Sequence, residues 1–123
     1  MERAALLIVD DEPLILETMA EFFEAFGFRV TACPEAASSL AAAFRTPFRA
    51  AIVDFRLPGI SGDELVRQLK ILQPRLEVFL HSGALDLDLS PELRNLGIGP
   101  DRIFFKPVDL LHMGKTIKAV LGV

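Results

Sequence analysis

Five short apolar runs, each separated from the next by a segment with helical spacing of apolar residues, constrain the fold of this chain most. The runs cover residues 6–9, 28–31, 51–53, 76–80 and 103–105. Most of them are continuously apolar, as is typical of strands covered on both faces. Strict alternation with short connections predicts an α/β domain with a mostly parallel sheet, right-handed crossovers and helices on both faces.

The segments between the runs have the features of helices. Apolar side chains recur at helical spacing around residues 15–26, 37–44, 65–72 and 110–121. Gly27, Pro34 and Pro47 separate the early elements, because both residue types interrupt regular structure. The fourth unit is less regular: an acidic segment, residues 85–89, precedes a short helix predicted from Ser90 as its cap and Pro91 at its first position.

Length and composition exclude several classes of protein. With 123 residues, of which 51% are hydrophobic, we expect residues 1–123 to form one domain without an effector domain. A net charge of -4 argues against direct binding of nucleic acid. Cys33 is the only cysteine, which fits a reducing compartment, and no apolar run resembles a signal peptide or a membrane span. We therefore expect a soluble, cytoplasmic protein that does not bind a membrane.

Polar residues follow the predicted strands at the edge where such sheets bind ligands. If the strand order is 2-1-3-4-5, the first and third strands are neighbours, and their ends flank the point where the order reverses. We therefore expect these polar residues to converge there: Asp10, Asp11, Asp54, Ser82 and Lys106.

This group of residues fits one kind of chemistry. Three carboxylates in close proximity repel each other unless a cation is present, and Mg²⁺ prefers oxygen ligands. With Asp54 as nucleophile, Ser82 as hydrogen-bond donor and Lys106 as fixed cation, the edge would support phosphoryl transfer. Each residue also has a simpler interpretation, such as Asp11 as the N-cap of the first helix. Their convergence on one edge of the sheet favours the functional interpretation.

Four motifs together resemble the receiver domain of two-component response regulators, the CheY-like family. They are Ile8-Val9-Asp10-Asp11-Glu12-Pro13, the segment from Val53 to Gly62, His81-Ser82-Gly83 and Phe105-Lys106-Pro107. The resemblance covers essentially the whole chain. It implies a doubly wound, flavodoxin-like α/β fold whose parallel sheet has the strand order 2-1-3-4-5.

The resemblance implies a phosphoacceptor that assists its own phosphorylation rather than an enzyme with a separate substrate. Asp54 would take a phosphoryl group from a sensor histidine kinase or a histidine phosphotransfer protein. Mg²⁺ would be held by Asp10, Asp11, Asp54 and the backbone carbonyl of Arg56. Ser82 and Lys106 would bind phosphoryl oxygens, and the Lys106–Pro107 peptide would be cis. A downstream target would bind the surface formed by the fourth helix, the fifth strand and the fifth helix.

The sequence departs from the family pattern at a few positions. Ile103 stands where many members carry an aromatic switch residue, so rotation of a tyrosine cannot be the output signal. Arg56 and Ala84 occupy the positions that tune hydrolysis of the phosphoaspartate in this family. The segment between Ser82 and Lys106 is slightly longer than in compact members, which points to an altered output surface.

Two residues near the site have structural interpretations, and three other functions compete. We expect His81 to point away from Ser82, because side chains alternate along a strand, and Cys33 to have a packing or surface role. A flavodoxin-like cofactor binder needs a phosphate-binding loop after the first strand. This chain has Asp10, Asp11 and Glu12 there, and their negative charges would repel a phosphate. An aspartate-nucleophile phosphatase needs a second catalytic aspartate two residues after the first, and neither Asp10 nor Asp54 is followed by an aspartate at that position. The remaining alternative is a pseudo-receiver, a protein-interaction module that does not switch by phosphorylation.

Overall fold

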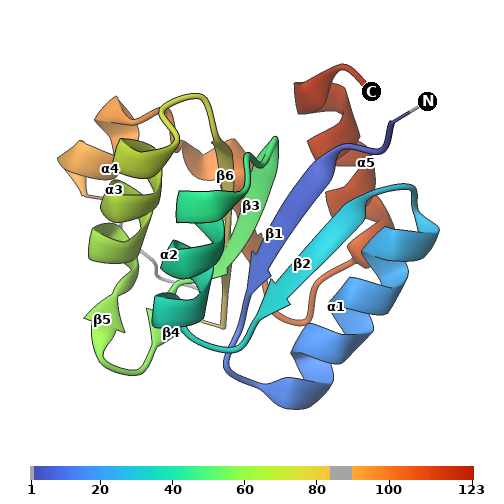
Figure 1. The fold of residues 1–123 in the computed structure, drawn as a ribbon, viewed down its shortest axis with the longest axis horizontal. Helices are drawn as coiled ribbons and strands as arrows, with labels where there is room; N and C mark the ends of the chain where they lie inside the picture. The colour runs from blue at the N-terminus through green and yellow to red at the C-terminus, as the bar shows by residue number, and fades with distance from the viewer. Residues whose placement is uncertain (1, 84–89) are drawn as a thin grey trace.

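A five-stranded parallel sheet forms the centre of the molecule (Figure 1). A computed structural model of the chain describes residues 2–83 and 90–123. The strand order is β2-β1-β3-β6-β7, and every neighbouring pair is parallel. Since β6 and β7 are the fourth and fifth strands of this sheet, the predicted α/β class and the order 2-1-3-4-5 are confirmed.

The elements follow one another in the predicted alternation, with two additions, a small hairpin and a 3₁₀ helix. A small antiparallel hairpin, β4–β5, lies between β3 and α3. In chain order the elements are β1 (Ala5–Val9), α1 (Pro13–Ala25), β2 (Arg29–Cys33), α2 (Ala36–Arg45), β3 (Ala50–Asp54), β4 (Arg56–Leu57), β5 (Ile60–Ser61), α3 (Gly62–Leu72), β6 (Glu77–Ser82), α4 (Pro91–Asn95), a 3₁₀ helix (Pro100–Arg102), β7 (Ile103–Phe105) and α5 (Leu110–Leu121).

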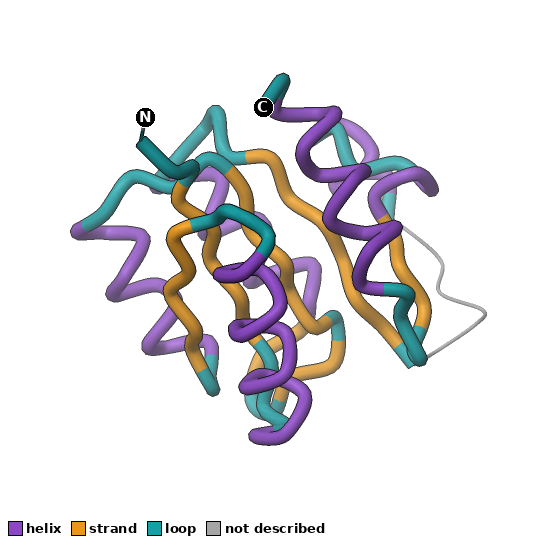
Figure 2. The backbone as a smooth tube through the Cα atoms, turned by 90° about the vertical axis from the view of Figure 1, so that its right-hand side faces the viewer, coloured by secondary structure: helices purple, strands orange, loops and turns teal. Residues whose placement is uncertain are grey.

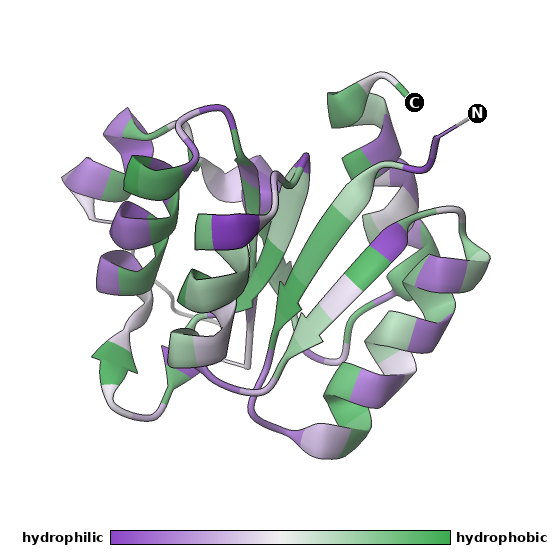
Figure 3. Ribbon diagram, viewed as in Figure 1, coloured by the Kyte–Doolittle hydropathy of each residue, from purple (hydrophilic) through white to green (hydrophobic). Residues whose placement is uncertain are grey.

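Helices cover both faces of the sheet, so the protein has two separate apolar layers. Helices α1 and α5 lie on one face, and α2, α3 and α4 lie on the other (Figures 1 and 2). The first layer includes Phe23 and Phe79, and the second includes Leu65 and Leu69, all without exposed surface. The strands are hydrophobic along most of their length, while the helices present polar residues outward (Figure 3). Burial on both faces explains why the central strands are continuously apolar.

Strand boundaries differ slightly from the prediction. The second strand runs over Arg29–Cys33 instead of 28–31, because each of its residues pairs with one residue of β1. Cys33 therefore ends the strand and is buried, in agreement with a packing role. The fourth strand of the sheet begins at Glu77 and extends to Ser82. In both strands, pairing with a neighbour determines the ends more than the apolar pattern does.

The fourth helical unit begins as predicted. Ser90 caps α4, its side chain accepting a hydrogen bond from the backbone N–H of Leu93, and Pro91 is the first helical residue. The acidic segment 85–89 and Ala84 lie outside the described residues. Among the helices that the structure describes, none is long and apolar enough to cross a membrane.

Gln73 connects the ends of α2 and α3 to the loop that leads into β3. Its side-chain nitrogen donates to the backbone carbonyls of Ala43 and Thr46 at 2.8 and 2.6 Å. Its side-chain oxygen accepts from the backbone N–H of Phe48 at 2.8 Å. One half-buried amide thus satisfies three backbone groups just before the strand that carries Asp54.

We expect Gln73→Ala to lower the free energy of unfolding by about 1–3 kcal/mol, because it leaves these backbone groups without their partner. Urea unfolding measures the change. Gln68→Ala is the matched control, because the one hydrogen bond of the Gln68 amide among the described residues goes to the side chain of Glu64 on the same helix, at 3.1 Å. Its expected cost is below about 0.5 kcal/mol. Equal losses in the two variants would show that the Gln73 network does not stabilise the fold.

Candidate functional site

The register of the central strands places three polar side chains in one row. Val9 of β1 pairs with Val53 of β3, and Asp54 pairs with His81 of β6. Asp10 directly follows β1 and continues the same row. Because side chains of paired residues in a parallel sheet leave the same face, Asp10, Asp54 and His81 point toward the layer of α1 and α5.

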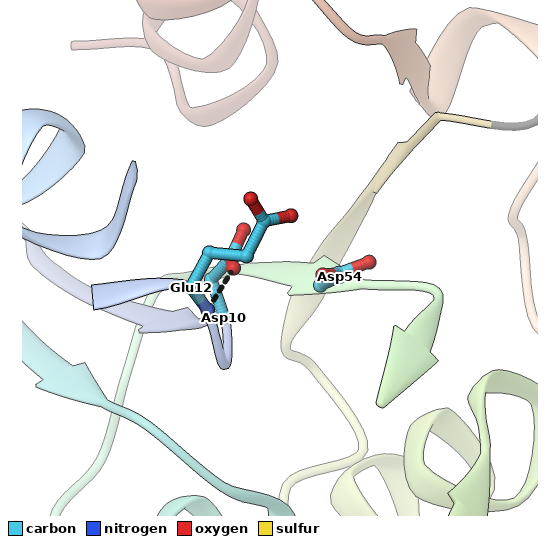
Figure 4. Close-up of side chains that lie close together, drawn as sticks. All are labelled: Asp10, Glu12 and Asp54. Atoms are coloured by element: carbon cyan, nitrogen blue, oxygen red, sulfur yellow. Dashed lines mark hydrogen bonds between the residues drawn. The ribbon is translucent and has the colours of Figure 1, made fainter. Parts of the chain in front are cut away.

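Asp10 is fully buried and makes the turn between β1 and α1 (Figure 4). Its Oδ1 accepts a hydrogen bond from the backbone N–H of Glu12 at 2.9 Å. Its Oδ2 has no hydrogen-bond partner among the described residues. Glu12, not Asp11, is the N-cap residue of α1, and its side chain makes no capping hydrogen bond. The interpretation of Asp11 as the N-cap is therefore wrong, because the turn at Asp10 moves the start of the helix one residue further.

Asp54 is the last residue of β3 and only 4% exposed. Its Oδ1 accepts from the backbone N–H of Arg56 at 3.1 Å, which fixes the carboxylate at the start of the β4–β5 hairpin. Its Oδ2 accepts from the Nζ of Lys106 at 3.4 Å. The carboxylate is thus held by a backbone donor on one side and by a cation on the other.

Lys106 connects the acidic residues of the site. It follows β7, and its Nζ lies 3.1 Å from Oε1 of Glu12 and 3.6 Å from Oδ2 of Asp10, in addition to its bond to Asp54. The backbone N–H of Lys106 donates to the carbonyl of Ser82, which ties the ends of β6 and β7 together. The Lys106–Pro107 peptide is cis, which confirms the prediction.

The other predicted site residues lie around this centre. Ser82 is fully buried at the end of β6, one residue beyond the position that pairs with Asp54. Arg56 begins β4 beside Asp54, with its side chain exposed. Asp11 lies exposed in the bend before α1 and is not a member of the close carboxylate group.

Burial and charge shift the pKa values of the two buried carboxylates in opposite directions. Burial is the largest cause of the raised pKa of Asp54, and the negative charge of Asp10 adds to it; the backbone N–H of Arg56 and the ammonium of Lys106 offset part of the shift. Burial also acts to raise the pKa of Asp10, but His81, the backbone N–H of Glu12 and Lys106 together lower it. For Lys106, burial acts to lower the pKa, and the surrounding carboxylates raise it.

Three carboxylates could hold a metal ion together. Asp10, Glu12 and Asp54 each offer an oxygen, and these oxygens lie within 4.8 Å of one another (Figure 4). The buried Oδ2 of Asp10 lacks a hydrogen-bond partner, as a ligand atom would in the absence of its ion. All donors are oxygens, and exposed Glu12 leaves room for water, so the group fits a hard divalent cation such as Mg²⁺.

Sequence reasoning missed two members of the site. Glu12 was noted only within the acidic motif, yet it contacts Lys106 and joins the carboxylate group. His81 does leave β6 on the face opposite to Ser82, as expected from strand alternation, but that face is the one toward which Asp10 and Asp54 point. Its Nδ1 lies 3.3 Å from Oδ2 of Asp10. Strand register, rather than residue type, was the signal that could have placed His81 in the site.

The raised pKa of Asp54 predicts how its substitution changes stability. Because the pKa of Asp54 is raised, the folded state binds the proton of this carboxyl more tightly than the unfolded state does. Above the ordinary pKa of 3.8 the unfolded state ionises first, so this group destabilises the metal-free fold as the pH rises. We expect metal-free Asp54→Asn to be more stable than wild type at neutral pH, by about 0.5–2 kcal/mol, the usual range for single stabilising substitutions. The difference in stability between the variant and wild type should shrink as the pH falls toward 3.8, because the Asp54 carboxyl then becomes protonated in both states. Urea unfolding at several pH values measures it, and a less stable Asp54→Asn at neutral pH would contradict the prediction.

Comparison with known proteins gives a consistent family. The model of the response regulator receiver domain matches residues 6–118. The transcriptional regulatory protein CreB of Escherichia coli is 35% identical over 122 residues, covering 98% of this chain and 52% of that protein. FixJ of Azorhizobium caulinodans is 30% identical over 121 residues, covering 98% of this chain and 56% of that protein. The chain thus spans about half the length of these two relatives.

A solved structure agrees with this comparison over nearly the whole chain. The CheY-like receiver domain protein of Methanospirillum hungatei superposes with a TM-score of 0.89 at 29% identity, covering 98% of this chain and 95% of that one. The match to the family model, the relatives and the shared fold together show that this chain belongs to the receiver domain family of two-component response regulators.

Proposed function

We propose that Asp54 accepts a phosphoryl group from a phosphohistidine of a sensor histidine kinase or a histidine phosphotransfer protein. The observation that carries this proposal is the position of the Asp54 carboxylate, buried at the end of β3 and in contact with Lys106 beside Asp10 and Glu12. A carboxylate nucleophile next to a fixed cation is what phosphoryl transfer by positioning and charge stabilisation requires. Because the kinase's donor histidine is intracellular, we place this reaction in the cytoplasm.

The transfer would exchange one bond at phosphorus for another. An Oδ atom of Asp54 forms the new P–O bond while the P–N bond to the donor histidine breaks, and the electron pair of that bond remains on the imidazole nitrogen. Lys106 releases part of its contact with Asp54 and binds a phosphoryl oxygen. Ser82 donates its hydroxyl to another oxygen. We assign no separate substrate, so the chain is a phosphoacceptor and not an enzyme in the usual sense.

The metal in this proposal is Mg²⁺. When bound, it supplies positive charge that neutralises the phosphoryl oxygens. Asp10, Asp54 and the backbone carbonyl of Arg56 would hold it, with Asp11 acting through water. The position of Glu12 in the carboxylate group supports a further water-mediated or direct contact from that side chain. Oxygen donors alone, from carboxylates and a carbonyl, support Mg²⁺ over a softer ion.

A groove beside the site supports docking of the phosphodonor protein. It has a volume of about 500 Å³ and lies between α1 and the start of α5, with Lys106 and His81 in its wall. Leu14, at the start of α1, lines the groove and is 75% exposed. An apolar side chain so exposed in the groove that contains Lys106 suits contact with the apolar face of a donor helix.

The output of phosphorylation would be read on the surface of α4, β7 and α5. On this surface Phe105 and Leu111 are exposed, whereas Ile103 is half-buried and packs against the core. An aliphatic residue at position 103 favours a signal carried by movement of the backbone of β7 over rotation of an aromatic ring. The same residue is the reason to keep the pseudo-receiver, which binds partners without phosphorylation, as the alternative.

Intact-protein mass spectrometry after incubation with acetyl phosphate tests the proposal, since the chain contains no Trp or Tyr as a fluorescent reporter. We expect wild type to gain one phosphoryl group with Mg²⁺ and essentially none with excess chelator. Asp54→Asn should gain none because it lacks the nucleophile.

The matched control is Asp101→Asn, which changes an exposed aspartate in the 3₁₀ helix. It should be phosphorylated to the same extent as wild type. If folded wild type stays unmodified with Mg²⁺, both by acetyl phosphate and by a set of histidine kinases, the pseudo-receiver becomes the better account.

A further inference from the structure

We propose that His81 is a positioning residue that holds the carboxylate of Asp10 in place for a divalent cation. This inference rests on the proposed function and adds a residue to it. His81 would act through Asp10 and would not touch the metal itself. Its Nδ1–H would donate to Oδ2 of Asp10 and fix the rotation of that carboxylate.

The two side chains lie close together and are almost completely buried. The side chain of His81 is 3% exposed and that of Asp10 is 0% exposed. Their Nδ1 and Oδ2 atoms lie 3.3 Å apart, but the directions fall short of a hydrogen bond, so both atoms lack a partner among the described residues. Two buried polar atoms that face each other without a bond are costly, and a small rotation of either group would join them.

The surroundings leave His81 as the nearest side-chain donor for this oxygen. Oδ1 of Asp10 already accepts the backbone N–H of Glu12, and the Nζ of Lys106 is 3.6 Å from Oδ2. Lys106 lies closer to Glu12 and to Asp54, and its role in binding a phosphoryl oxygen would draw it away. Within residues 2–83 and 90–123, His81 has no hydrogen bond or ion pair with Glu12 or Asp54 that would compete with its contact to Asp10. It also lies outside the group of three carboxylates whose oxygens come within 4.8 Å of one another, which argues against His81 as a direct ligand.

Neighbouring strands fix the backbone from which the imidazole of His81 extends. His81 pairs with Asp54 on β3 and with Phe104 on β7, so both sides of its backbone are held in the sheet. A residue held in this way can fix a ligand's orientation, and loss of such an outer partner typically weakens metal binding by about 10–100-fold. Replacement by an apolar side chain would leave the Asp10 oxygen buried against carbon, free to turn away from the metal.

Binding of Mn²⁺ alone, followed by the electron paramagnetic resonance signal of the free ion, tests the inference without any phosphoryl transfer. Mn²⁺ is suitable because it shares the preference of Mg²⁺ for oxygen ligands. The variants are His81→Leu, which removes the donor, and His81→Asn, whose side-chain N–H can take the place of Nδ1–H. His112→Leu and His112→Asn make the same changes at the exposed histidine of α5 and serve as matched controls.

We expect His81→Leu to bind Mn²⁺ about 10-fold or more weakly than wild type. His81→Asn should recover most of the affinity, and both His112 variants should bind as wild type does. A folded His81→Leu variant that binds Mn²⁺ as tightly as wild type would overturn the role of His81 while leaving the proposed function intact. If wild type itself binds no Mn²⁺, the metal-dependent function and this inference both fail.

A second measurement uses only folded protein with an intact His81, in case His81→Leu does not fold. The chain has two histidines, so the ¹⁵N spectrum of His112→Asn, labelled at histidine, contains the imidazole of His81 alone. With Mg²⁺ bound, we expect Nδ1 of His81 to carry a hydrogen. A bare Nδ1 in the Mg²⁺-loaded protein would exclude donation to Asp10 and overturn the inference.

Discussion

The parallel pairing of β1, β3 and β6 is the constraint on which the site depends. It brings Asp10, Asp54 and His81 into one row at the end of three buried strands, although they are far apart in the sequence. Pairing of β6 with β7 then brings Lys106 to the same edge, where its ammonium contacts the carboxylates. A shift of any of these strands by one residue would turn its polar side chain to the opposite layer. The hydrophobic packing of two layers thus fixes the geometry of a polar site that contributes little to that packing.

This arrangement holds groups in positions that do not favour stability. Asp54 is buried near another negative charge, and the buried Oδ2 of Asp10 has no hydrogen-bond partner in the described part of the chain. Such features are typical of functional sites, where the rest of the fold over-determines a locally unfavourable arrangement. The layers around Phe23 and Leu65, and networks such as that of Gln73, provide the compensating stability.

Much of the fold followed from the sequence because burial on both faces leaves a strong apolar signal in each central strand. The site followed as well, since parallel strands place their carboxyl ends at one edge. The hairpin β4–β5 was not predicted, because two strands of two residues each are too short to carry an alternating pattern. The contacts of His81 and Glu12 were not predicted either. They depend on the register between strands and on the path of one turn. Neither can be predicted from the residue types within a single segment.

The contacts of Lys106 have a consequence for the electric field at the reactive carboxylate. Asp10, Glu12 and Asp54 carry three negative charges when ionised, and Lys106 cancels only one of them. The local charge without a cation is therefore repulsive to an anionic donor, and a single divalent ion would bring it to neutrality. Under the proposed function, acceptance of a phosphoryl group would then depend on the concentration of divalent ions as well as on the donor protein.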